Sequence, residues 1–154
     1  MKKWLLFVLE LLPMLLCIGM IFMFSSEVST ESSARSGQTC IYFVDIANEL
    51  FHLDLKEEER YEIAALIEYP VRKLAHMTEY ALLALSSWFF VVFRTAKNPI
   101  RYGTVVLIGL IVATLDEFYQ TTVPGRSGQI ADVLVDETGV LLMALVIFVI
   151  IRKI

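Results

Sequence analysis

Cysteine, histidine and phosphate-binding loops are scarce or absent in this sequence, which excludes several kinds of site. The chain has two cysteines and two histidines, without the CxxC or Cys/His spacing of a zinc site. Cys17 lies within a long apolar stretch and Cys40 lies beyond it, so we predict no disulfide between them. No Walker loop or other nucleotide motif is present.

Basic charge is also in short supply. The 154 residues include 13 Lys and Arg against 17 Asp and Glu, and the net charge of −4 argues against nucleic acid as a partner. Hydrophobic residues make up 57% of the chain, and the mean hydropathy is +0.67. That is too apolar for a soluble domain of this length and is typical of a polytopic membrane protein.

Long apolar stretches dominate what is present. Each approaches the roughly 20 residues that a bilayer requires, and none shows the alternation of a barrel strand, so helices are predicted. The first stretch carries Glu10 and Pro13 and lacks a small-residue cleavage site, which favours a retained span over a secretory signal. The predicted fold is all-α, a single membrane domain over residues 1–154 with four transmembrane helices at residues 4–24, 73–93, 102–119 and 133–151.

Basic residues predict the orientation of these helices. Lys and Arg in short loops stay cytoplasmic, and here they occupy three places that four spans would put on one side. Both termini are therefore predicted inside, and the acidic segment 25–71 outside. The residues used are Lys2, Lys3, Arg94, Lys97, Arg101, Arg152 and Lys153.

The outer segment is predicted to be partly helical. Residues 25–38 are rich in Ser, Thr and Glu and indicate an irregular segment, while 40–55 and 57–69 show amphipathic patterns. Pro70 is predicted to end the second helix. We expect both helices to lie along the membrane surface or to cap the helix ends as a solvated cover. Their acidity argues against direct binding of anionic headgroups.

Ionisable residues inside the predicted spans are the most informative feature. They are costly in lipid unless paired or facing a polar cavity, and by default they mark a functional site. Arg72, His76 and Glu79 share one helix face because they are spaced i, i+4, i+7. The topology brings to the same outer end the polar residues of the other spans, namely Asp116, Glu117, Gln120, Asp132 and Asp136.

These residues fall in motifs that resemble a known family. Residues 72–80 match RKxxHxxEY, residues 116–120 match DExxQ, and residues 124–128 match PGRxG, followed by Asp132 and Gly139; Ser25 and Ser26 match a further SS element. In this order and spacing, over nearly the whole chain, the sequence is similar to the VanZ-like family. The resemblance implies a multi-pass protein of the bacterial cell membrane with a cell-envelope role linked to teicoplanin resistance, and it implies no reaction. Asp136 departs from the Asn that many members have there.

Three roles stay open for the polar set. The first is an ion-pair network that locks the helix ends. The second is a binding site for an anionic lipid-linked ligand, such as an undecaprenyl-phosphate-linked cell-wall precursor, or for a glycopeptide. Arg72 and Arg126 would hold a phosphate bidentately, and Gly125 would let backbone N–H groups approach it.

The third role is a hydrolase or transferase acting on polyprenyl phosphates, with His76 as acid, base or nucleophile. One histidine with several carboxylates would also accept Mg²⁺, Mn²⁺ or Ca²⁺, but no metal ligand set is assigned, and no cofactor or oligomeric state is predicted. The candidate catalytic residues are His76, Glu79, Asp116, Glu117 and Asp132. The candidate ligand-binding residues are Arg72, Lys73, Gln120, Gly125, Arg126 and Asp136.

Overall fold

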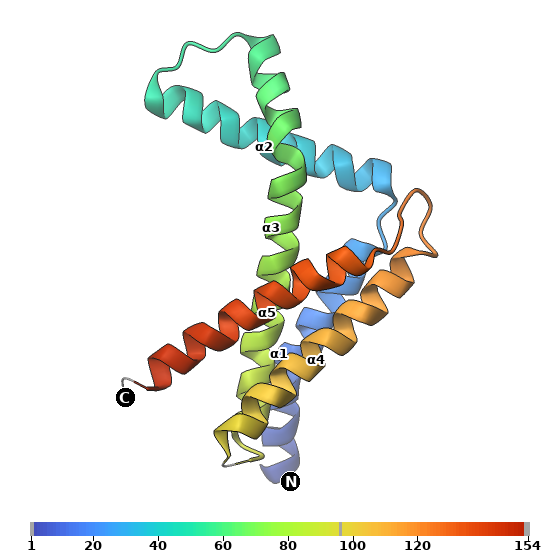
Figure 1. Ribbon diagram of the computed structural model, residues 1–154, viewed down its shortest axis with the longest axis vertical. Coiled ribbons are helices and arrows are strands. Elements are labelled where there is room, and N and C mark those ends of the chain that lie inside the picture. The colour runs from blue at the N-terminus through green and yellow to red at the C-terminus, as the bar shows by residue number, and fades with distance from the viewer. Residues whose placement is uncertain (1, 96, 153–154) are drawn as a thin grey trace.

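The computed structural model describes residues 2–95 and 97–152 of the chain. This part contains five α-helices and no strand, which confirms the all-α prediction (Figure 1). Lys153, one of the basic residues used for topology, lies outside the described residues, as do the side chains of Lys2 and Lys3. The helices are α1 (Lys2–Ser25), α2 (Ser29–Phe51), α3 (Glu57–Val92), α4 (Asn98–Gln120) and α5 (Ile130–Ile151).

Three of these helices are long and apolar enough to cross a membrane. They cover Trp4–Ser25, Asn98–Gln120 and Ile130–Ile151, in agreement with three of the predicted spans. The fourth predicted span, at residues 73–93, falls in α3 and is not among them, so the prediction of four apolar spans is wrong. The reason is that α3 carries polar residues in this stretch and turns several of them, including Ser86 and Ser87, toward the other helices.

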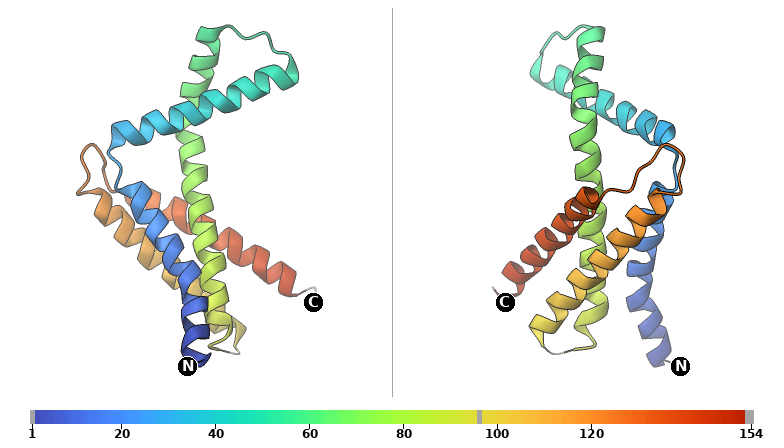
Figure 2. Two further views of the ribbon diagram at one scale, coloured as in Figure 1. Left: turned by 180° about the vertical axis from the view of Figure 1, so that it is seen from behind. Right: turned by 45° about the vertical axis from the view of Figure 1, so that its right-hand side comes forward.

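Helix α3 is the centre of the structure. It packs against α1, α2, α4 and α5, and both views in Figure 2 show the other helices arranged around it. Its buried residues, with Tyr80 and Leu83 at 0% exposure, form one apolar core with residues of α1, α4 and α5. Burial of this core explains why the helices converge, since apolar packing and not propensity supplies most helix stability.

Helix α5 crosses α3 at a very short distance. A Cβ placed on Gly139 would lie 2.1 Å from the backbone oxygen of Met77, a contact that only glycine permits. Asp136 lies one turn before Gly139 in α5, and His76 lies next to Met77 in α3. The close crossing therefore brings these two polar residues to the same point.

The segment between α1 and α3 differs from the sequence prediction. Helix α2 begins at Ser29, so most of the stretch expected to be irregular is helical. Its hydroxyl groups bond within the helix, with Ser36 Oγ donating to Ser32 O and Thr39 Oγ1 to Arg35 O, both at 3.0–3.1 Å. Packing of α2 on α3 around Cys40 and Ala64 then outweighs the weak helix propensity of the serines.

Pro70 does not end a helix, and this prediction is also wrong. Helix α3 runs through it for 36 residues, about 54 Å at 1.5 Å per residue. Proline removes the N–H that would bond the carbonyl of Leu66, but Leu66 is 79% exposed and Pro70 is also exposed. The first half of α3 therefore continues the line of the bundle helix, with α2 crossing it, and does not lie across the helix ends (Figure 1).

Candidate functional site

Two adjoining cavities lie between α2, α3 and the 121–129 loop. They lie at the end of the bundle of α1, α3, α4 and α5 that is uppermost in Figure 1. Their volumes are about 190 Å³ and about 290 Å³. Four residues line both cavities, namely Ser32 of α2, Arg72 and His76 of α3, and Arg126 of the loop. The face of α3 that carries Arg72 and His76 thus forms the wall between α2 and the loop.

The two cavities differ in chemistry. The smaller one has an apolar wall of Phe24, Val71 and Ala75, with Arg35 and Glu79 at its polar side. The larger one is almost wholly polar and is lined by Lys73, Gln120, Gly125 and Asp132 together with hydroxyl groups of α2. The smaller cavity would suit the apolar part of an amphiphilic ligand, and the larger cavity would suit its polar part.

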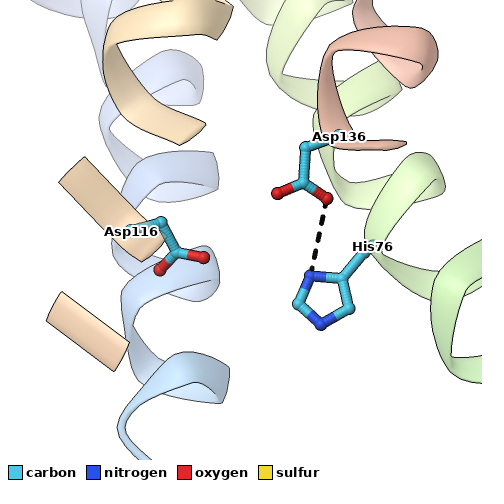
Figure 3. Close-up of side chains that lie close together, drawn as sticks. All are labelled: His76, Asp116 and Asp136. Atoms are coloured by element: carbon cyan, nitrogen blue, oxygen red, sulfur yellow. Dashed lines mark ion pairs between the residues drawn. The ribbon is translucent and has the colours of Figure 1, made fainter. Parts of the chain in front are cut away.

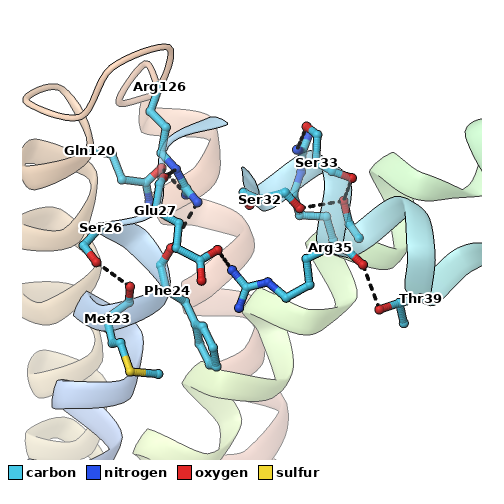
Figure 4. A network of polar contacts seen from close by, with 12 residues as sticks. Met23, Phe24, Ser26, Glu27, Ser32, Ser33, Arg35, Thr39, Gln120 and Arg126 are labelled. Atoms are coloured by element: carbon cyan, nitrogen blue, oxygen red, sulfur yellow. Dashed lines mark hydrogen bonds and ion pairs between the residues drawn. The ribbon is translucent and has the colours of Figure 1, made fainter. Parts of the chain in front are cut away.

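Arg126 ties the 121–129 loop to the end of α1. Its Nε donates to Glu27 O at 2.8 Å and an Nη donates to Phe24 O at 3.0 Å, while the other Nη lies 3.4 Å from Gln120 Oε1 (Figure 4). A cation is favourable beside the last carbonyls of a helix. Burial lowers the pKa of this guanidinium, and the nearby Asp116 acts in the opposite direction. Most of the hydrogen-bond donors of Arg126 are thus already used by acceptors of the protein.

The other two arginines at the cavities have fewer polar partners. Arg35 pairs with Glu27 and lies over the ring of Phe24, 5.1 Å from its centroid (Figure 4). Arg72 reaches only Ser33 Oγ at 3.4 Å and Glu68 Oε1 at 4.0 Å. Both contacts of Arg72 are long, so this side chain is the cavity arginine with most hydrogen-bonding capacity left for a ligand.

Lys73 bonds Asp132 across the larger cavity. The Nζ–Oδ1 distance is 2.5 Å, and the side chains are 20% and 23% exposed. This pair joins α3 to the first turn of α5. The charges of Lys73 and Asp132, both predicted site residues, therefore compensate each other.

Gln120 and Glu117 form a buried network at the end of α4. Gln120 Nε2 lies 3.0 Å from Asp116 Oδ2, 3.1 Å from Glu117 Oε1 and 3.4 Å from Ser25 Oγ. Glu117 Oε2 accepts a hydrogen bond from the backbone N–H of Gln129 at 2.8 Å. Glu117 thus orders the loop before α5 and lines neither cavity.

His76, Asp116 and Asp136 form a second polar cluster in the same region. They come from α3, α4 and α5, and their side chains point toward a common space (Figure 3). His76 Nδ1 is 3.7 Å from Asp136 Oδ1. Asp116 and Asp136 are 0% and 1% exposed, and Asp116 Oδ1 and Asp136 Oδ2 have no hydrogen-bond partner among the described residues.

The structure brings every predicted site residue to this one end of the bundle, although in different settings. Those that line a cavity are Arg72, Lys73, His76, Glu79, Gln120, Gly125, Arg126 and Asp132. Asp116 and Asp136 belong to the histidine cluster, and Glu117 faces the loop backbone.

Helix α2 supplies residues that the sequence prediction missed. Ser32, Arg35 and Ser36 line the smaller cavity, and Ser36 Oγ donates to Glu68 Oε1 at 2.7 Å. A signal for Arg35 is present in the sequence, because it is the only Arg or Lys between Glu27 and Leu55 in an acidic segment. It was missed because that segment was expected to be irregular.

The sequence matches a known protein family. A family model described as VanZ/LLP1 matches residues 10–152, nearly the whole chain. No curated protein and no solved structure matches the chain. The match spans all the helices that build the cavities and the buried clusters. The chain therefore belongs to the VanZ/LLP1 family.

Proposed function

We propose that the chain binds an anionic, lipid-linked phosphate in the two adjoining cavities, at the outer face of the bacterial cell membrane. One observation carries the proposal: Arg72, His76 and Arg126 stand between a compartment with an apolar wall and a compartment lined by polar groups. Polyprenyl phosphates, the carriers of cell-wall precursors, have this division between an apolar chain and a charged headgroup.

The headgroup would lie in the larger cavity. Arg72 offers the planar fork of donors that matches phosphate oxygens, and its existing contacts at 3.4 Å and 4.0 Å are weak competitors. Ser29 and Ser33 of α2 line the same cavity and add hydroxyl donors. The first isoprenoid units would contact Phe24, Val71 and Ala75 in the smaller cavity.

The proposed orientation follows from the ends of the bundle. In Figure 1 the start of α1, the end of α5 and the facing ends of α3 and α4 lie toward the bottom, while the 121–129 loop, which borders the larger cavity, lies at the other end of the bundle. The bottom end carries Arg94, Arg101 and Arg152, which the positive-inside rule assigns to the cytoplasm. With the three apolar helices in the bilayer and the second half of α3 packed among them, the cavities would open at the outer leaflet.

A binding assay tests this proposal. The protein is purified into nanodiscs of neutral lipid, and binding of undecaprenyl phosphate is compared with binding of undecaprenol, which lacks the charge. We expect Arg72→Gln to weaken phosphate binding about tenfold or more, because a charge-assisted hydrogen bond contributes about 1.5–3 kcal/mol.

The control variant is Arg60→Gln. Arg60 is also an α3 arginine in a salt bridge, with Asp45 at 2.8 Å, but it lines neither cavity. Equal loss in both variants, or equal affinity of the wild type for phosphate and alcohol, would overturn the proposal. In cells, the Arg72 variant is expected to lower teicoplanin tolerance while the Arg60 variant leaves it unchanged.

Catalysis on the same ligand is the second candidate function. It is favoured by the position of His76, which lines both cavities with Asp136 3.7 Å from its Nδ1. A histidine oriented by a carboxylate serves as a general base in many hydrolases. Mass spectrometry of the bound lipid distinguishes the two candidates, since turnover of polyprenyl phosphates or lipid-linked precursors indicates an enzyme and retained intact lipid indicates binding alone.

A further inference from the structure

We propose that His76, Asp116 and Asp136 form a binding site for one divalent metal ion. The three residues come from α3, α4 and α5, so an ion there would join the three helices at the inner side of the cavities (Figure 3). The inference does not rest on phosphate binding, because the cluster is defined by its own geometry.

The spacing of the three side chains is close to that of a coordination sphere. One ligand atom from each residue lies within 4.8 Å of those of the other two. Bonds from a metal to nitrogen or oxygen are about 2.1 Å long, so three ligand atoms around one ion stand at most about 3.6 Å apart. An inward movement of up to about 0.7 Å by each ligand atom would close the site, and rotation about side-chain bonds supplies such a movement.

The unpartnered oxygens point to a cation. Asp116 and Asp136 are almost wholly buried, yet Asp116 Oδ1 and Asp136 Oδ2 have no hydrogen-bond partner among the described residues. A buried acceptor without a partner loses its hydration without compensation. A metal ion at the common point of the cluster would contact an oxygen of each carboxylate.

Neighbouring contacts hold the ligands in place. Gln120 Nε2 lies 3.0 Å from Asp116 Oδ2, which fixes this carboxylate and leaves Oδ1 without a partner among the described residues. The Gly139–Met77 crossing sets the distance between Asp136 and His76. Hydrogen bonds and packing that orient ligands in this way are a regular part of metal sites.

Charge balance supports a divalent ion. Two carboxylates lie together in the cluster, while Lys73 bonds Asp132 and Arg126 bonds backbone carbonyls. Buried charges require compensation, and His76 carries one positive charge at most. A proton shared between the carboxylates is the competing account.

The donor set favours a transition metal. Imidazole suits zinc and similar ions, carboxylates suit Mg²⁺, Ca²⁺ and Mn²⁺, and one imidazole with two carboxylates suits Mn²⁺ or Zn²⁺ best. His76 also lines both cavities, so the proposed ion would be bound next to them. A metal in this position would take a nitrogen of the His76 ring and so exclude a role for that nitrogen as a general base.

Mn²⁺ titration followed by electron paramagnetic resonance tests the site. Protein in neutral nanodiscs is first treated with a chelator, and the wild type is expected to bind one Mn²⁺ with nitrogen coupling from a histidine. His76→Gln should abolish the coupling, and Asp116→Asn and Asp136→Asn should each lower affinity about tenfold or more. Zn²⁺ should compete with Mn²⁺ more strongly than Mg²⁺ does.

Two control variants are matched to the ligands. Glu137 is a neighbouring α5 carboxylate whose oxygens also lack hydrogen-bond partners among the described residues, but it is not in the cluster, so Glu137→Gln should retain Mn²⁺ binding. His52→Gln should retain the nitrogen coupling, since His52 is in the turn between α2 and α3.

Two results would overturn the proposal. One is a folded wild type that binds no Mn²⁺ or binds it without nitrogen coupling. The other is Mn²⁺ affinity that is the same in the wild type and in both aspartate variants. If the variants fail to fold, the nitrogen coupling of the wild type and its thermal stabilisation by Mn²⁺ still decide the question. A shared proton would instead give a wild type insensitive to Mn²⁺ and an Asp136→Asn variant of higher stability.

Discussion

Two regions of this molecule use charged residues in opposite ways. In the arm formed by α2 and the first half of α3, the Arg60–Asp45 pair is 32% and 41% exposed. At the upper end of the bundle, Asp116 and Asp136 are 0% and 1% exposed. The arm has a small apolar core around Cys40, while polar contacts such as Lys73–Asp132 and Gln120–Ser25 join different helices at the bundle end.

Within the sequence motifs at the bundle end, some residues bond mainly to other protein groups and others face the cavities. Arg126, Gln120 and Glu117 each bond to two or more protein groups, so their removal would leave buried partners unsatisfied. Arg72 and His76 face the cavities and make long contacts. An ion network and the proposed binding site are thus not exclusive alternatives, because different residues would serve each.

The largest effect is expected from Gly139→Ala, which fills the crossing of α3 and α5. The added Cβ would lie 2.1 Å from Met77 O, and a backbone atom cannot move aside as a side chain can. We expect a loss of about 3 kcal/mol in the free energy of unfolding, as found for severe overpacking. Unfolding in detergent by denaturant measures it.

Gly37→Ala is the matched control in the arm. A Cβ on Gly37 would meet nothing within 4 Å, and Gly37 is in the interior of α2. Alanine there should raise stability by up to about 1 kcal/mol through helix propensity. Equal effects of the two substitutions would mean that α3 and α5 do not cross at Gly139.

A smaller loss in the free energy of unfolding is expected from Arg126→Gln. This change removes the bonds to Phe24 O and Glu27 O and frees the 121–129 loop from α1. The expected loss is about 2 kcal/mol, because the bonds are charge-assisted and partly buried. Denaturant unfolding measures the stability, and hydrogen exchange of residues 121–129 should rise in parallel.

Arg60→Gln provides the comparison for Arg126. It breaks the exposed salt bridge with Asp45, for which a loss of about 0.5 kcal/mol in the free energy of unfolding is typical. If it destabilised the protein as much as Arg126→Gln does, the contrast between the arm and the bundle end would be lost.

How much of this could be predicted from the sequence depends on the kind of signal. Helical spacing placed Arg72, His76 and Glu79 on one face, and they line one cavity. The stretch 73–93 of α3 was wrongly predicted to be an apolar span because it carries polar residues, including Ser86 and Ser87, that are buried against the neighbouring helices. The helix predicted at 40–55 is present as the second half of α2, but the first half was missed because serine-rich segments have weak helix propensity, and only the tertiary contacts with α3 decide their state.

A gain in stability, as for Gly37→Ala, is expected from Pro70→Ala in α3, the helix that joins the two regions. Alanine restores an N–H that can bond the carbonyl of Leu66 and removes the ring that disturbs the helix. Both residues are exposed, so water now satisfies part of what the missing bond would supply. We therefore expect a gain of about 1 kcal/mol, well below the roughly 3 kcal/mol cost of proline in an ideal helix interior. The gain should appear as slower hydrogen exchange near Leu66, with exchange around Tyr80 unchanged. Faster exchange in both places would mean that proline is required to direct the arm over the cavities, and that the arm and the bundle end are coupled through this helix.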